Sequence, residues 1–216
     1  MISPNHNARP ADQAIDMLLL HYTGMATGDA ALARLCDEAA EVSAHYLIDE
    51  GGEVVALVSE DRRAWHAGVA CWAGARDING CSIGIELVNP GHEFGYRAFP
   101  QAQMAALLTL CGDILGRHSI PPHRVLGHSD VAPARKEDPG ELFDWTALAV
   151  AGIGLWPEAK GANPVPALED FGYDVAGAGL VACATAFQRH WRPAKIDGVM
   201  DAECQDLLAG LLDQIA

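Results

Sequence analysis

The chain has 216 residues, half of them hydrophobic, and a formal net charge of -15 with an isoelectric point of about 4.8. This length fits one domain, or one domain with a small appended module, and the composition is sufficient for a buried core. A protein that binds nucleic acid needs a basic surface. The acidic balance therefore excludes nucleic acid as the expected partner.

The chain shows no sequence signal for secretion or for a membrane span. Residues 1–12 are polar, and no basic segment is followed there by an apolar one, so we expect no signal peptide. The apolar run at residues 15–20 is too short to cross a bilayer. The six cysteines form no CxxC pair, and we interpret them as small buried hydrophobic residues in a reducing compartment, with disulfides as the alternative. A cytoplasmic location is favoured, with the periplasm or cell envelope as the alternative.

The N-terminal half predicts strands and one helix. Residues 15–22 form a short apolar run that ends in a histidine, and this length favours a strand over a helix. Apolar residues then recur at helical spacing over residues 32–39. Two short apolar segments, at residues 45–48 and 54–58, flank the turn sequence DEGG and predict a hairpin.

The next segments continue this alternation. Residues 82–88, SIGIELV, predict another strand, and residues 104–115 form an amphipathic helical stripe that begins shortly after Pro100. A short strand is expected at residues 124–127. Strands that alternate with helices, together with one hairpin, predict an α/β fold with a mixed central β-sheet flanked by helices.

The last quarter of the chain is predicted to be a separate helical module. Residues 156–166, WPEAKGANPVP, have the composition of a linker. Two or three short helical patterns follow, which predict a small helical module. We therefore divide the chain into a first domain at residues 1–155, a linker at 156–167 and a C-terminal module at 168–216. A unit of about fifty residues buries little surface, so the module is expected to dock on the first domain.

Three polar side chains lie where predicted strands end or just beyond. His21 ends the first apolar run, His128 follows the strand at residues 124–127, and Asp138 lies ten residues later in ARKEDPG. Two imidazoles and one carboxylate suffice for a catalytic zinc with a fourth position open to water. The spacing alone is a weak signal, because a single histidine is more often a surface or hydrogen-bonded core residue. That simpler interpretation is kept for His6, His92, His118, His123 and His190.

Two further charged residues are candidates for chemistry. Glu86 interrupts an apolar strand, and alternation places it on the face opposite Ile85 and Leu87. It either faces solvent or points into a site, where burial would raise its pKa and suit a general base. Lys136, two residues before Asp138, is either an ordinary loop lysine or a donor to a developing oxyanion.

Six segments together resemble the type-2 N-acetylmuramoyl-L-alanine amidases, whose fold is shared with phage T7 lysozyme-like amidases and peptidoglycan recognition proteins. The segments occur in family order and cover most of residues 1–155: SPNHNARP, LLLHYTG, VSAHYLIDEGGEV, RRAWHAGV, NGCSIGIELVN and GHSDVAPARKEDPG. The C-terminal residues resemble a three-helix peptidoglycan-binding module, but they depart from it at residues 175–179 and at Cys204.

The resemblance implies a role for each candidate residue. It assigns the ligands of one Zn2+ per chain to His21, His128 and Asp138. Glu86 matches the catalytic glutamate, and Lys136 matches the lysine that supports the tetrahedral intermediate. Trp65 and His66, in AWHAG, resemble positions that line the groove and bind substrate.

The implied activity is zinc-dependent hydrolysis of the amide bond between N-acetylmuramic acid, or its 1,6-anhydro form, and L-alanine. The substrate is peptidoglycan in cell-wall turnover or muropeptides in recycling, and the sequence leaves both open. Two alternatives are a peptidoglycan-binding protein without turnover and a zinc peptidase that acts on the stem peptide. The complete ligand set favours the amidase.

Overall fold

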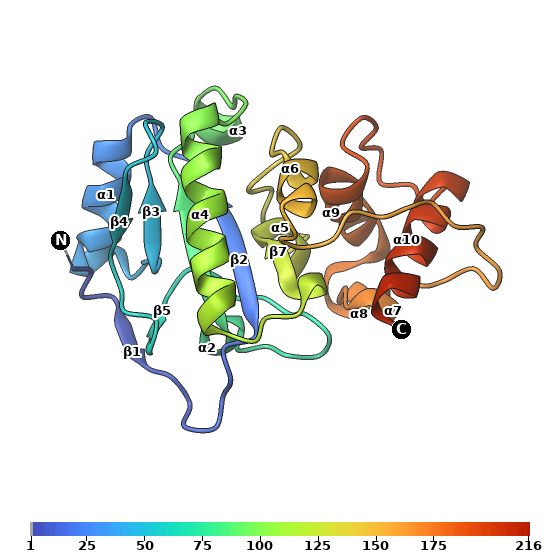
Figure 1. The fold of residues 1–216 in the computed structure, drawn as a ribbon, viewed down its shortest axis with the longest axis horizontal. Coiled ribbons are helices and arrows are strands. Elements are labelled where there is room, and N and C mark those ends of the chain that lie inside the picture. The colour runs from blue at the N-terminus through green and yellow to red at the C-terminus, as the bar shows by residue number, and fades with distance from the viewer. Residues whose placement is uncertain (1) are drawn as a thin grey trace.

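The centre of the fold is a five-stranded sheet of order β4-β3-β6-β2-β7, seen in a computed structural model that describes residues 2–216 (Figure 1). Its strands are β2 (Met17–Tyr22), β3 (Tyr46–Ile48), β4 (Val54–Ala56), β6 (Ser82–Leu87) and β7 (Val125–Gly127). Neighbouring strands are parallel except for the β3–β4 hairpin. The mixed sheet and its hairpin are therefore as predicted.

The two faces of the sheet are covered by different parts of the chain. Successive side chains of β2 point to opposite faces. Leu18 and Leu20 belong to a buried cluster with Leu107 and Ile114 of α4 (Gln101–Arg117), which lies in front of the sheet in Figure 1. Met17, Leu19 and His21 therefore point to the other face. Because both faces of β2 are buried, the sequence of this strand is a nearly continuous apolar run.

The remaining elements of the first domain are short. Thr27 caps the N-terminus of α1 (Gly28–Cys36) by accepting a hydrogen bond from the Ala30 N–H. Two three-residue strands, β1 (His6–Ala8) and β5 (Arg62–Ala64), pair as a separate ribbon that the sequence did not predict. The other short helices are α2 (Ile78–Cys81), the 3-10 helix Glu38–Ala40, α3 (Gly91–Phe94), the 3-10 helix Pro122–Arg124, α5 (His128–Val131) and α6 (Trp145–Val150).

The C-terminal residues are helical, with four helices instead of the predicted three: α7 (Leu168–Phe171), α8 (Val175–Ala178), α9 (Leu180–Trp191) and α10 (Ala202–Ile215). Two of them, α7 and α8, are single turns, too short to produce a helical pattern in the sequence. Residues 156–166 contain no helix or strand.

The C-terminal helices share a hydrophobic core with the second face of the sheet. This cluster joins Met17 and Leu19 of β2 to Phe187 of α9 and Leu208 of α10. At Gly172 a Cβ would lie 2.6 Å from the Trp72 ring, so only glycine allows the two segments to approach this closely. The expectation that the module docks is therefore confirmed by a continuous core, and Figure 1 shows these helices beyond β7.

A buried carboxylate in α5 ties the module to the first domain. Asp130 is fully buried and accepts hydrogen bonds from the Gly127 N–H at 2.8 Å, the Tyr173 hydroxyl at 2.6 Å and His190 Nδ1 at 2.7 Å. The His190 ring also stacks on Trp145, with ring centroids 3.7 Å apart. Because a buried carboxylate is costly unless it is hydrogen-bonded, Asp130 makes the stability of α5 depend on residues of the module.

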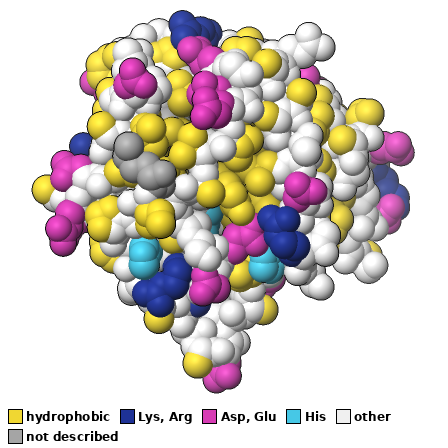
Figure 2. Space-filling model, turned by 60° about the vertical axis from the view of Figure 1, so that its left-hand side comes forward, with side chains coloured by type: hydrophobic (Ala, Val, Ile, Leu, Met, Phe, Trp, Pro, Cys, Tyr) yellow, Lys and Arg dark blue, Asp and Glu magenta, His cyan; other side chains and the backbone are white. Residues whose placement is uncertain are grey.

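The cysteines lie mostly in the interior, and the visible surface carries charges of both signs. All six cysteines are free, and five of them are buried. One face of the molecule shows hydrophobic side chains gathered near its centre, with charges of both signs around them (Figure 2). That face has no uniformly basic surface. Within residues 2–216 no helix is long and apolar enough to cross a membrane.

The shared core predicts that the module stabilises the first domain. Truncation after Pro166 removes two of the partners of Asp130 and exposes the apolar face around Met17 and Leu19. We expect a lower thermal midpoint for the truncated chain, and a single transition for the full chain, measured by scanning calorimetry.

Point variants test the same coupling without deletion. His190→Ala should cost about 1–3 kcal/mol, the penalty of leaving a buried acceptor short of a donor. His123→Ala, at a half-buried histidine of the first domain, is the control and should leave the midpoint unchanged. A truncated chain as stable as the full chain would show that the module is an independent unit.

Candidate metal centre and active site

Three buried side chains converge at the ends of β2 and β7. His21 Nδ1 lies 3.0 Å from Asp138 Oδ2 and 2.9 Å from His128 Nδ1, and His128 Nδ1 lies 3.0 Å from the same carboxylate oxygen. The three ligand atoms lie within 4.8 Å of one another. No other group of three or more metal-ligating side chains with this geometry occurs in residues 2–216. The sequence predicted these three residues, and the fold brings them together.

The sheet explains this convergence. The parallel register pairs His21 of β2 with Glu86 of β6, so both side chains lie at the same end and on the same face of the sheet. β7 ends at Gly127, and His128 begins α5 immediately afterwards. The loop that follows α5 returns to it, because the Ser129 N–H donates to the Asp138 carbonyl at 2.9 Å. Strand order and one loop contact therefore place all these groups together.

Burial and mutual contact set the protonation of the cluster. Burial, and then the adjacent His128 ring, lower the pKa of His21 to about 4. Burial alone would raise the pKa of Asp138, but contact with the two histidine rings, His128 first, holds that pKa well below its usual range. At neutral pH the cluster therefore offers a neutral His21 imidazole and an ionised Asp138 carboxylate, the protonation states that a metal ion requires.

Glu86 faces this cluster. Burial, and then the Asp138 carboxylate, raise the pKa of Glu86 well above its ordinary value, while Lys136 opposes the rise. Its Oε2 atom is buried and has no hydrogen-bond partner among the described residues. A buried carboxylate oxygen without a partner marks a position where a ligand, water or ion belongs.

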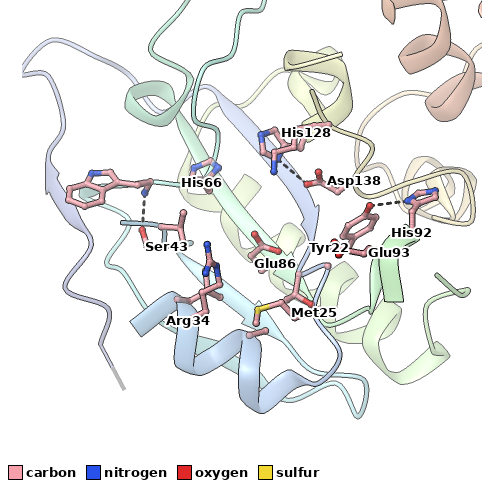
Figure 3. A pocket seen from close by; sticks show the side chains of 17 residues that line it. Tyr22, Met25, Arg34, Ser43, His66, Glu86, His92, Glu93, His128 and Asp138 are labelled. Carbon is pink, nitrogen blue, oxygen red and sulfur yellow. Dashed lines mark hydrogen bonds and ion pairs between the residues drawn. The ribbon is translucent and has the colours of Figure 1, made fainter. Parts of the chain in front are cut away.

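Glu86, His128 and Asp138 line one pocket with a volume of about 330 Å³ (Figure 3). His128 and Asp138 lie at one end of it, Glu86 faces its centre, and Arg34 of α1 reaches in from the opposite wall. Lys136 also lines the pocket. Arg34 was not anticipated from the sequence, because its helix shows only ordinary amphipathic spacing.

The two predicted groove residues lie in the wall of this pocket. Trp65 is half-buried, and its Nε1–H donates to Asn7 Oδ1 at 3.1 Å. His66 is buried, and its Nδ1 lies 3.0 Å from His21 Nε2. Burial, and then the neighbouring His21, lower the pKa of His66 well below its ordinary value, so its ring is neutral. Their predicted role in substrate binding stays a prediction.

Comparison with known proteins identifies the family. Residues 11–141 match the family described as N-acetylmuramoyl-L-alanine amidase, and this range includes His21, Glu86, His128, Lys136 and Asp138. The chain belongs to the N-acetylmuramoyl-L-alanine amidase family. It is therefore an amide-hydrolysing enzyme, and the predicted α/β fold is the fold of this family.

Similar amidases cover nearly the whole chain. It is 37% identical to the N-acetylmuramoyl-L-alanine amidase AmiD of Escherichia coli over 99% of this chain and 88% of AmiD. The structure of AmiD with anhydro-N-acetylmuramic acid-L-Ala-D-gamma-Glu-L-Lys matches with a TM-score of 0.83 and covers 95% of this chain and 93% of that one.

Two more relatives differ in how much of the chain they match. AmpDh3 of Pseudomonas aeruginosa, solved in complex with an anhydromuramic pentapeptide, is 32% identical, has a TM-score of 0.83 and covers 100% of this chain and 98% of its own. The 1,6-anhydro-N-acetylmuramyl-L-alanine amidase AmpD of Enterobacter cloacae is 35% identical and covers 67% of this chain and 84% of its own. AmpDh3 therefore matches the whole chain, whereas AmpD matches about two thirds of it.

Proposed function

We propose that this amidase hydrolyses the bond between 1,6-anhydro-N-acetylmuramic acid and L-alanine in soluble muropeptides, with one zinc ion held by His21, His128 and Asp138. The observation that carries this proposal is the buried cluster of two imidazoles and one carboxylate beside the partnerless oxygen of Glu86. The named activity of AmpD and the ligands bound to AmiD and AmpDh3 support the anhydro-muropeptide as the substrate class.

The residues fit zinc rather than a harder cation. Two imidazole nitrogens and one carboxylate oxygen form a donor set that is typical of catalytic zinc, whereas Mg2+ and Ca2+ prefer sites made only of oxygen ligands. When bound, zinc would polarise the substrate carbonyl and make an attacking water more acidic. The ion's positive charge would also lower the raised pKa of Glu86.

Glu86 is assigned the proton transfer and Lys136 the stabilisation of charge. Glu86 lies on the strand beside His21, so its carboxylate is placed to take a proton from the attacking water and pass it to the leaving amine of L-alanine. Lys136 lines the same pocket and is placed to stabilise the negative charge that develops on the carbonyl oxygen.

Three other proposals concern substrate contact, location and the division of the chain. Trp65 offers an aromatic face at the pocket wall for the sugar or peptide, and His66 lies beside it. The six free cysteines support a reducing compartment, and hence a cytoplasmic role in muropeptide recycling. The division into residues 1–155, 156–167 and 168–216 is supported by the helix-free linker, although the two parts share a core.

The function is tested with purified anhydro-muropeptide and intact sacculi as parallel substrates. We expect release of a peptide with a free N-terminal L-alanine from the soluble substrate, and loss of activity with a chelator that zinc restores. Metal analysis should give about one zinc per chain, as a single open site requires. His128→Ala should abolish both zinc retention and turnover, and full activity in this variant would refute the assignment. Cleavage within the stem peptide would indicate the peptidase alternative.

Glu86→Gln tests the general base. The amide keeps the shape of the side chain but cannot take a proton at neutral pH, so turnover should fall on the order of 10²-fold or more. Zinc content, measured on the same preparation, should be unchanged. Turnover close to that of the unchanged enzyme would mean that Glu86 only supports the fold.

Lys136→Ala tests the oxyanion donor. Removal of one such donor costs roughly 2.7–4 kcal/mol of transition-state stabilisation. Because the charge develops only in the transition state, kcat should fall while KM changes little. Lys160→Ala, at an exposed lysine of the linker outside the pocket, is the control and should leave kcat near the original value. A raised KM with normal kcat would make Lys136 a substrate-binding residue instead.

A further inference from the structure

A chain of hydrogen bonds runs from the metal cluster into the interior of the first domain. His21 Nε2 lies 3.0 Å from His66 Nδ1, and His66 Nε2 lies 3.3 Å from the Ser82 hydroxyl oxygen. The Ser82 hydroxyl lies 2.5 Å from the Ile78 carbonyl oxygen. All four residues are buried, so this chain exchanges little with solvent. It reaches His21 on the nitrogen that faces away from the metal cluster.

The far end of the chain fixes the direction of every hydrogen bond in it. A backbone carbonyl can only accept, so the Ser82 O–H must donate to the Ile78 carbonyl. Ser82 has one hydroxyl proton, and its oxygen must then accept from His66 Nε2–H. A neutral imidazole carries one N–H, so His66 Nδ1 is left as an acceptor for His21 Nε2–H. His21 Nδ1 is thereby left without a proton, and its lone pair faces His128 and Asp138.

The strand next to His66 is shaped to admit this ring. A Cβ built on Gly84 would lie 2.5 Å from the Cγ and Nδ1 atoms of His66, so any other residue would displace the imidazole. Asn79 holds the segment from another side, because its Oδ1 accepts from the N–H groups of His66 and Ala67 at 3.0 and 2.8 Å. Ser82, Gly84 and Glu86 alternate along one face of β6. The strand that presents Glu86 thus also seats His66.

We propose that His66 is a positioning residue of the metal centre, which, supported by Ser82 and Gly84, holds His21 in the tautomer that presents Nδ1 to the ion. This inference rests on the proposed zinc site and adds a role that substrate binding would not give to His66. The second hydrogen bond of a metal-binding histidine fixes its tautomer and orientation, and its loss typically weakens metal binding on the order of 10- to 100-fold.

The test measures the zinc affinity of the full chain by competition with a chromogenic chelator. His66→Ala should bind zinc on the order of 10- to 100-fold more weakly than the unchanged protein. His66→Asn keeps an acceptor near the Nδ1 position and should recover part of this affinity. Ser82→Ala frees His66 to take either tautomer, so it should weaken zinc binding in the same direction but less. His123→Ala is the matched control, because that ring lies outside the pocket, and its affinity should be unchanged.

A second readout separates positioning from substrate contact and from misfolding. The absorption spectrum of the cobalt-substituted protein reports the geometry of the site, and it should change in His66→Ala and return toward the original in His66→Asn. Circular dichroism of each metal-free variant identifies any that fail to fold. If His66→Ala does not fold, His66→Asn and Ser82→Ala decide the question.

Each outcome bears on a distinct claim. Zinc affinity within twofold of the unchanged protein in folded His66 and Ser82 variants, with a raised KM, would overturn the positioning role and make His66 a substrate residue. Unchanged zinc affinity in His21→Ala and His128→Ala would overturn the metal site itself. A third outcome separates the two proposals. If the unchanged protein binds zinc but hydrolyses no muropeptide, and zinc affinity falls in His66→Ala, the positioning role is supported and the proposed function is refuted.

Discussion

The structure depends on the burial of three ligating groups in one small space. His21, His128 and Asp138 are 1%, 3% and 5% exposed, and their ligand atoms lie within 4.8 Å of one another. Two imidazoles cannot become charged there at low cost, and a carboxylate without solvent is costly unless a cation or several donors contact it. A divalent ion would satisfy all three groups at once. The surrounding polar contacts then act mainly to hold these groups in place, as the Ala67 carbonyl does for His128 Nε2 at 2.9 Å.

The C-terminal helices also help to hold the ligating groups in place. They cover the sheet face from which His21 and Glu86 project, and they supply Tyr173 and His190 to Asp130, two residues after His128. A short helix such as α5 has little stability of its own. Contacts from α9 and from the segment after α7 therefore hold the turn that presents His128. A chain that uses its last quarter in this way holds the turn that carries His128 more firmly.

Much of the site could be predicted because six segments of the sequence resemble one amidase family, whereas the spacing of His21, His128 and Asp138 alone is a weak signal. The segments around His21, Glu86, His128 and Asp138 each ended a strand or followed one, and the fold places them as expected. The relation of His66 to Ser82 could not be predicted, because it depends on a loop crossing over the missing side chain of Gly84. The ribbon of β1 and β5 was missed for a different reason. Their sequences, HNA and RRA, contain no apolar run that would predict a strand.

The register between β2 and β6 fixes where Ser82, Gly84 and Glu86 lie relative to His21. Residues 82, 84 and 86 of β6 pair with residues 17, 19 and 21 of β2, so the Ser82 hydroxyl and the Glu86 carboxylate point to one face, and Gly84 leaves room there for His66. A slip of one residue would turn Glu86 and Ser82 toward α4 and place Ile83 and Ile85 beside His21. The apolar residues that α4 covers, Leu18, Leu20, Ile83 and Ile85, oppose such a slip. The hydrophobic core on one face of the sheet thus fixes the position of the polar groups on the other.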